Sequence, residues 1–139
     1  MSLENLKFEL HPSLGNHRDP INNRYYPKKN DRDQKITFLA NREEKLKPNE
    51  RRIFDLKLRA QVDENHLLHL TSNYEFASRN GAFIVDRYIT HRNRDWLYIT
   101  LWNTTNTVFI IKPDDILCEG YLLHAPHLYS IEIVKKIEV

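Results

Sequence analysis

The chain has 139 residues, 40% of them hydrophobic, and carries 21 basic and 19 acidic side chains for a formal net charge of +2. This length and apolar content suffice for one domain with its own core. The near balance of charge gives no electrostatic reason to expect binding to nucleic acid or to a membrane surface. The single cysteine, Cys118, excludes an intrachain disulfide and a zinc site made only of cysteines.

The segment over residues 1–35 differs in composition from the rest of the chain. Three of the six prolines lie in residues 11–35, where apolar side chains are few. Near the start, Leu6, Phe8 and Leu10 alternate with polar residues, which predicts a first strand. We therefore expect an extended N-terminal arm over 1–35 and a β domain over 36–139. A polar arm of this kind can reach a neighbouring subunit or another protein.

Apolar and polar residues alternate in most segments that follow the arm. The longest alternation runs over residues 54–62, and a second occupies residues 96–102. A period of two is that of a β-strand, which sends one set of side chains to the core and the other outward. No window of ten or more residues shows helical periodicity. Many short strands at close spacing predict an all-β sandwich or barrel.

The chain also lacks the sequence features of secretion and membrane insertion. No apolar run approaches the ~20 residues that a membrane-spanning helix needs. The first residues show no basic stretch followed by an apolar one, as a secretory signal would. We expect a protein that is neither secreted nor membrane-spanning, in a compartment that keeps Cys118 reduced.

Two segments near the end carry a family resemblance. Residues 101–103 read Leu-Trp-Asn, and residues 109–119 read Phe-Ile-Ile-Lys-Pro-Asp-Asp-Ile-Leu-Cys-Glu. This resembles the last hairpin of the trimeric dUTPases, where a strand ending Leu-aromatic-Asn precedes Phe-x-Ile-x-x-Gly-Asp-x-Ile-Ala-Gln. The resemblance implies a dUTPase-like jelly roll or β-clip. It also implies a homotrimer with strands contributed across subunits.

The first two motifs of that family are altered here. In the first motif, Tyr-Asp-Leu-x-Ala, the segment Ile-Thr-Phe-Leu-Ala at 36–40 places Thr37 where the family has its acid. The second motif, Arg-Ser-Gly, holds phosphates in the family. It corresponds to residues 70–75 around Asn73, which contain no arginine, and Glu75 would repel phosphate.

The third motif, Gly-Val-Ile-Asp-x-x-Tyr-Arg-Gly, supplies the family's catalytic base. Residues 87–90 read Arg-Tyr-Ile-Thr, so that Thr90 takes the position of the base, Asn93 that of the tyrosine and Arg94 that of the arginine. A threonine hydroxyl does not act as a general base near neutral pH without a further activator.

The fourth motif is the best preserved and the fifth is absent. Asp115 matches the family's Asp, whereas Glu119 replaces its Gln. The fifth motif is a Gly-rich arm, and no glycine follows Gly120. Asp115 alone can also serve to cap a turn. We therefore expect no catalytic residues, no cofactor and no metal, with an active dUTP hydrolase as the remote alternative.

A dUTPase-like body with replaced catalytic positions, no Gly-rich tail and an apolar last residue resembles the dUTPase-derived early-region proteins of adenoviruses. This resemblance implies a non-enzymatic viral accessory protein that acts through protein–protein contacts. We expect a component of the virion, in a minor capsid or cementing role beside capsid proteins. The alternative is an adaptor that binds host signalling proteins in the cytoplasm or nucleus of the infected cell.

Two features offer protein-binding surfaces. The aromatic set of residues 96–102, namely Trp96, Tyr98 and Trp102, faces away from the aliphatic set. These rings can form an exposed anchor or fill a second sheet or a subunit interface. The end Ile137, Glu138 and Val139 can add as a strand to a PDZ domain, or pair within the trimer.

The histidines come in two pairs with a spacing of three. These are His66 with His69 and His124 with His127. Residues three apart on a strand point to opposite faces, so we expect neither pair to converge on a metal ion.

Overall fold

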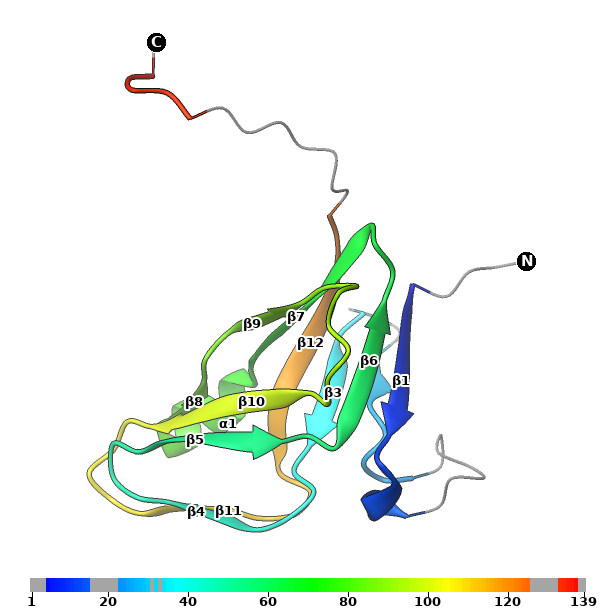
Figure 1. Ribbon diagram of the computed structural model, residues 1–139. Coiled ribbons are helices and arrows are strands. Elements are labelled where there is room, and N and C mark those ends of the chain that lie inside the picture. The colour runs from blue at the N-terminus through cyan, green and yellow to red at the C-terminus, as the bar shows by residue number, and fades with distance from the viewer. Residues whose placement is uncertain (1–4, 16–22, 31, 33, 126–132, 138–139) are drawn as a thin grey trace.

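The structure is a computed structural model that describes residues 5–15, 23–30, 32, 34–125 and 133–137 (Figure 1). The first seven strands are β1 (Leu6–Leu10), β2 (Lys28–Lys29), β3 (Ile36–Leu39), β4 (Glu44–Leu46), β5 (Arg51–Asp55), β6 (Leu58–Val62) and β7 (His66–Ser72). The later strands are β8 (Ala82–Ile84), β9 (Arg87–Ile89), β10 (Tyr98–Asn103), β11 (Phe109–Ile111) and β12 (Ile116–His124). Two short helices, η1 (Pro12–Leu14) and α1 (Tyr74–Asn80), complete the described elements.

All strand pairs among these elements are antiparallel. The largest sheet has the order β2-β3-β12-β7-β9, and a three-stranded sheet has the order β5-β10-β8. Two-stranded pairs β1-β6 and β11-β4 lie beside them. Strands distant in the sequence therefore pair with one another, as in jelly-roll topologies, and the predicted all-β class is confirmed.

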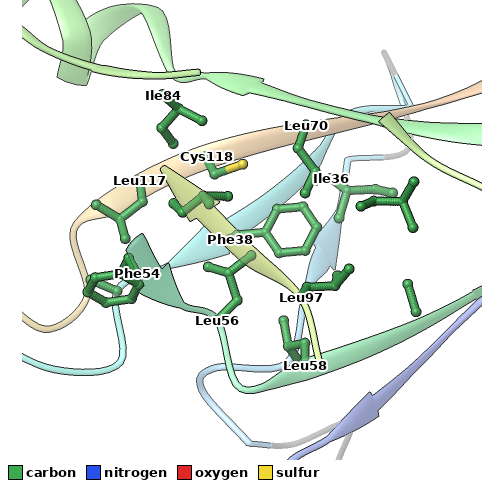
Figure 2. Close-up of a cluster of buried hydrophobic side chains, with 14 of the residues drawn as sticks. Ile36, Phe38, Phe54, Leu56, Leu58, Leu70, Ile84, Leu97, Leu117 and Cys118 are labelled. Carbon is green, nitrogen blue, oxygen red and sulfur yellow. The ribbon is translucent and has the colours of Figure 1, made fainter. Parts of the chain in front are cut away.

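The core lies between the inner faces of these sheets. The alternation predicted over residues 54–62 is observed, since Phe54, Leu56, Leu58, Ala60 and Val62 are all buried. Figure 2 shows the buried cluster around Phe38. One methylene removed from such a core costs roughly 1 kcal/mol, so this cluster dominates the stability of the domain.

Gly120 is required where β12 crosses this core. A Cβ atom at position 120 would lie 2.9 Å from Cε2 of Phe38 and 3.2 Å from Cδ1 of Leu68. Both neighbours are themselves buried, so neither side chain can move aside easily. Because position 120 stays on the core side, the next residue in each direction along β12 points to the outer face of the sheet.

Two tight turns use residues other than glycine in the left-handed region. Asn49 has a φ of 60° in the turn closed by Glu50 N and Lys47 O, and Asp114 has a φ of 76° in the turn closed by Asp115 N and Lys112 O. Each turn has proline at its second position, which presets the required backbone angle. These turns connect β4 to β5 and β11 to β12.

The helix α1 was not predicted from the sequence. It has 7 residues, which is too short to display a helical period. Its ends carry the local signals instead, because the Asn73 side chain accepts from Phe76 N and Gly81 ends the helix with a φ of 65°. No helix among the described residues has the length and apolar character to cross a membrane.

The described parts of residues 1–35, which the sequence assigns to the arm, lie against the β domain. β1 pairs with β6 over its whole length, and Leu10 belongs to the core. Further along, Tyr25 packs on the core and Arg24 forms an ion pair with Asp114. The arm was expected to have little core of its own, and in the structure Leu6, Phe8, Leu14 and Tyr25 pack against the core beside Leu10.

Candidate functional site

The outer face of the five-stranded sheet brings three of the predicted motif positions together. The register pairs Glu119 on β12 with Thr37 on β3 and with Thr71 on β7. Asn73 follows the end of β7, and its Nδ2 donates to Oε1 of Glu119 over 2.6 Å. Thr37, Asn73 and Glu119, which the resemblance assigns to the first, second and fourth motifs, thus form one cluster, called here the Glu119 cluster.

Glu119 is a buried carboxylate with partners on both oxygens. Only 8% of the residue is exposed. Tyr121 donates its hydroxyl hydrogen bond to Oε2 over 2.9 Å, and Lys35 places its ammonium 3.5 Å from Oε1. A buried carboxylate requires such compensation, because an isolated charge is costly to remove from water. Hydrogen bonds and one cation thus provide partners for both carboxylate oxygens of Glu119.

Asn73 is committed to two structural contacts. Its Oδ1 caps α1 by accepting from Phe76 N over 2.9 Å, while its Nδ2 binds Glu119. Both ends of the amide are used, and the described neighbours of Glu119 include one cation, Lys35. A phosphate brought to this cluster would meet a carboxylate at its centre, and that contact is repulsive. Among the described residues, the donors of the Glu119 cluster are directed at the Glu119 carboxylate and not at a site for a bound anion.

The Thr90 position lies in a turn that is closed by its own hydrogen bonds. Thr90 Oγ1 accepts from Arg92 N, and Asn93 N donates to Thr90 O. Within the described part of the chain, the Thr90 hydroxyl has no carboxylate or imidazole partner that could draw off its proton. Asn93 and Arg94 line a groove of about 460 Å³ with β1 and β6.

Asp115 serves the turn between β11 and β12. Its Oδ2 accepts from Lys112 N over 2.9 Å, and its backbone carbonyl accepts from Ala40 N. This is the capping role that the sequence left open beside the catalytic one. Within one subunit, the described motif positions therefore lie in three places, namely the Glu119 cluster, the Thr90 turn and the Asp115 turn.

Comparison with known proteins gives likeness in structure alone. No family model and no curated protein sequence matches the chain. Staphylococcus bacteriophage 80alpha dUTPase matches with a TM-score of 0.77 at 14% identity, covering 96% of this chain and 98% of that one. EIAV dUTPase has a TM-score of 0.74 at 12% identity and coverages of 96% and 99%. The dUTPase from phage phi11 of S. aureus has 0.74 at 16%, with 96% and 100%.

The chain has the dUTPase-like fold. This confirms the fold predicted from the segments 101–103 and 109–119. Identity of this size establishes architecture, and function must be argued from the residues of the site. The loss of catalysis and the likeness to adenovirus proteins stay predictions.

On this dUTPase-like scaffold, the predicted aromatic anchor is partly covered by arginines. Arg51 lies over Trp102 with its Cζ 4.4 Å from the ring centroid, and Arg87 lies over Tyr98 at 3.9 Å. Trp96 precedes β10 and packs between Arg59, at 4.2 Å, and the ring of His11. The three rings face outward as predicted, but Trp96 contacts the β1–β6 pair and the other two rings do not.

The C-terminal positions proposed for partner binding are described only in part. Ile137 is 79% exposed and Ile133 is 94% exposed. Glu138 and Val139 lie outside the described residues, so the PDZ and trimer-strand predictions both stay open there.

The histidines do not form a metal centre among the described residues. His66 binds Asp63 and His69 binds Asp86, over 2.8 and 3.2 Å, so the two rings have separate partners. His66 does meet His124 across β7 and β12, with ring centroids 5.2 Å apart. The hydrogen bond from His66 is the main reason that the pKa of Asp63 lies below its usual value, assisted by the Asn65 amide.

Cys118 is buried beside the Glu119 cluster but faces the core. Burial raises the pKa of its thiol far above the usual range, so the thiolate that a nucleophile needs is not formed near neutral pH.

Sequence reasoning missed the residues that complete the Glu119 cluster, namely Lys35, Thr71 and Tyr121. Tyr121 was within reach of prediction, because residues two apart on a strand share a face and Glu119 was already singled out. Lys35 directly precedes β3 and Thr71 lies on β7, so their approach depends on the register of β12 with β3 and β7.

Proposed function

We propose that this chain is a non-enzymatic viral accessory protein, a homotrimer on a dUTPase-like scaffold, that acts through protein–protein contacts. One observation carries the proposal: the contact of 2.6 Å between Asn73 and Glu119. The resemblance assigns Asn73 to the second motif, which holds phosphate in the family, and Glu119 to the fourth motif, where it replaces a Gln. Here they hold each other, with the carboxylate neutralised internally by Lys35. Such a site is stable without a ligand and repels the triphosphate of a nucleotide.

Nucleotide binding is the direct test of this step. Calorimetric titration of the protein with dUTP and Mg²⁺ should give no heat of binding up to millimolar nucleotide. The variant Asn73→Arg with Glu119→Gln supplies a guanidinium and removes the repelling carboxylate, and it should bind measurably better than the parent. Micromolar affinity of the parent chain for dUTP would contradict the proposal.

Within this function we propose a virion-associated role beside capsid proteins. Support comes from a fold shared with phage and EIAV dUTPases and from the internal pairing of Asn73 with Glu119. Mass spectrometry of highly purified virions should find the chain at a fixed ratio to capsid proteins after salt washing. Abundance in the lysate of infected cells together with absence from particles would exclude this role.

A second candidate is a host-directed adaptor, favoured by the exposed apolar tail residues Ile133 and Ile137. Regulatory use of the fold has a parallel, because phage dUTPases control transfer of virulence genes. Deleting residues 137–139 should abolish capture of a defined PDZ domain if the tail is the recognition element. Unchanged capture would remove the tail from this function.

A further inference from the structure

The outer face of the sheet β5-β10-β8 carries a regular array of side chains, called here the β10 face. The antiparallel registers align side chains in rows across the sheet, and beyond the end of β8 the rows continue with Val85 and with Arg87, the first residue of β9. The rows are Arg51–Trp102–Phe83, then Ile53–Thr100–Val85, then Asp55–Tyr98–Arg87. Figure 1 shows β5 and β10 side by side at the front of the molecule.

Apolar side chains dominate this array and are open to solvent. Ile53 is 63% exposed, Val85 48%, Phe83 42% and Tyr98 40%. The residues between them on the strands, such as Phe54 and Ile99, are buried in the core. Contiguous apolar surface on a sheet face marks an interaction site more often than scattered single residues do.

Two arginines stand at opposite corners of the β10 face and are held in place by the rings. Arg51 lies on Trp102, and Arg87 lies on Tyr98 while its Nη1 donates to Tyr98 O over 2.8 Å. Neither arginine forms an ion pair with any described residue. The one acid of the face, Asp55, is already matched by Lys57 at 3.6 Å. The face therefore has two fixed cations without counter-charges.

We propose that the β10 face docks an extended segment of a partner protein that presents acidic side chains on either side of an apolar one. The apolar side chain would cover Ile53 in the middle row, and the carboxylates would reach Arg51 and Arg87. Tryptophan, tyrosine and arginine are the residues that carry binding energy at protein interfaces, and a planar guanidinium already stacked on a ring loses little freedom on binding a carboxylate. The inference rests on the proposed function and specifies the chemistry of its partner.

Two other occupants fit less well. Bases of a single-stranded nucleic acid stack on open aromatic rings, but guanidinium groups already cover Trp102 and Tyr98. A second copy placed face to face would bring its Arg51 and Arg87 to this face. Asp55, the one acid of the face, is already paired with Lys57, so these arginines would find no unpaired carboxylate on the β10 face.

The test measures the anisotropy of fluorescently labelled peptides, acetyl-(Glu-Ser-Leu-Ser)₃-amide and acetyl-(Lys-Ser-Leu-Ser)₃-amide, titrated with the full chain; in an extended peptide every second side chain shares a face, so the charged and leucine side chains point to the same side. A labelled dT₁₅ strand is titrated in parallel. The interface variant is Arg51→Glu with Arg87→Glu. Its matched control is Lys7→Glu with Lys45→Glu, which makes the same change in net charge at exposed positions outside the face.

The acidic peptide should bind the parent chain at least tenfold more tightly than the basic peptide does. The interface variant should bind the acidic peptide at least tenfold more weakly than the parent, while the control variant should keep the parent's affinity. An equal loss in the control, absence of peptide binding, or arginine-dependent preference for dT₁₅ would overturn the proposal. So would a fall in oligomer mass on Ile53→Arg, measured by sedimentation, because the face would then lie between subunits. The proposed function is tested separately: binding of dUTP by the parent chain would contradict it, irrespective of the result with the peptides.

Discussion

Lys57 occupies the left-handed region with a φ of 57°, which is unfavourable for any residue with a Cβ atom. The chain accepts this cost at the corner between β5 and β6, where Lys57 N donates to Asp55 Oδ1 and Lys57 O accepts from His11 N. Lys57→Gly should raise the free energy of unfolding by about 0.5–1 kcal/mol, since glycine relieves the strain but has a more flexible unfolded state. Chemical denaturation measures this, and Lys57→Ala, which keeps the strain, should give no gain.

Asp63 gives the molecule a pH dependence at the acid end. Its pKa is lowered in the folded state, first by the hydrogen bond from His66. A depressed carboxyl pKa contributes stability above the unfolded value of about 3.9, and this contribution is lost as pH falls through the folded pKa. Unfolding followed between pH 7 and pH 2 should show a smaller loss of stability for Asp63→Asn than for the parent. An identical acid limb in the two proteins would rule out this role for Asp63.

At the scale of elements, the buried amide of Asn103 ties two turns together at the end of β10. Its Nδ2 lies 2.8 Å from Thr107 O, 3.1 Å from Lys47 O and 3.3 Å from Leu46 O. Its Oδ1 accepts from the backbone and hydroxyl of Thr105. This one residue fixes the β4–β5 turn against the loop before β11, and so explains the Leu-aromatic-Asn pattern of residues 101–103 in structural terms.

Asn103→Asp should therefore be among the most damaging isosteric changes in the chain. A carboxylate would face three carbonyl oxygens in a buried site, at a cost of about 3 kcal/mol or more at pH 7. The buried acid has a raised pKa, so the cost should shrink as pH falls towards 4 and the group becomes protonated. Thermal unfolding at both pH values measures this. Asn106→Asp, an exposed change in the same loop, should have little effect at either pH.

The elements also show how far the sequence determines the fold. Alternation over residues 54–62 and 96–102 predicts strands and their inward faces correctly, because a period of two depends only on local geometry. The helix α1 escapes such analysis, since 7 residues span about two turns. The docking of residues 5–15 and 23–30 escapes it too, because that depends on contacts such as Arg24 with Asp114 between distant parts of the chain.

For the candidate site, too, the sequence predicts the motif positions but not the contacts that depend on strand pairing. The motif spacing placed Thr37, Asn73 and Glu119 in three separate motifs, and the sheet register unites them. The sequence could not show that Asn73 binds Glu119, because the two are 46 residues apart and meet only through the pairing of β7 with β12. The arginine cover on Trp102 and Tyr98 was missed for the same reason: the guanidinium groups come from neighbouring strands.

At the scale of the whole molecule, the chain has the dUTPase-like fold, whereas several positions assigned to the family's motifs carry other residues. The fold matches dUTPases over almost the entire chain. The buried cluster, the proline turns and the Asn103 anchor maintain that architecture. Among the positions that the resemblance assigns to the family's motifs, Asn73 caps a helix and binds Glu119, and Asp115 closes a turn.

Turnover of dUTP tests this central claim most directly. Pyrophosphate release should be followed with Mg²⁺ and a high concentration of the purified chain, beside Asp115→Ala as the matched variant. The account predicts that the parent and the variant both give no release above the protein-free background. Mg²⁺-dependent release by the parent that Asp115→Ala abolishes would show an active hydrolase and contradict the account.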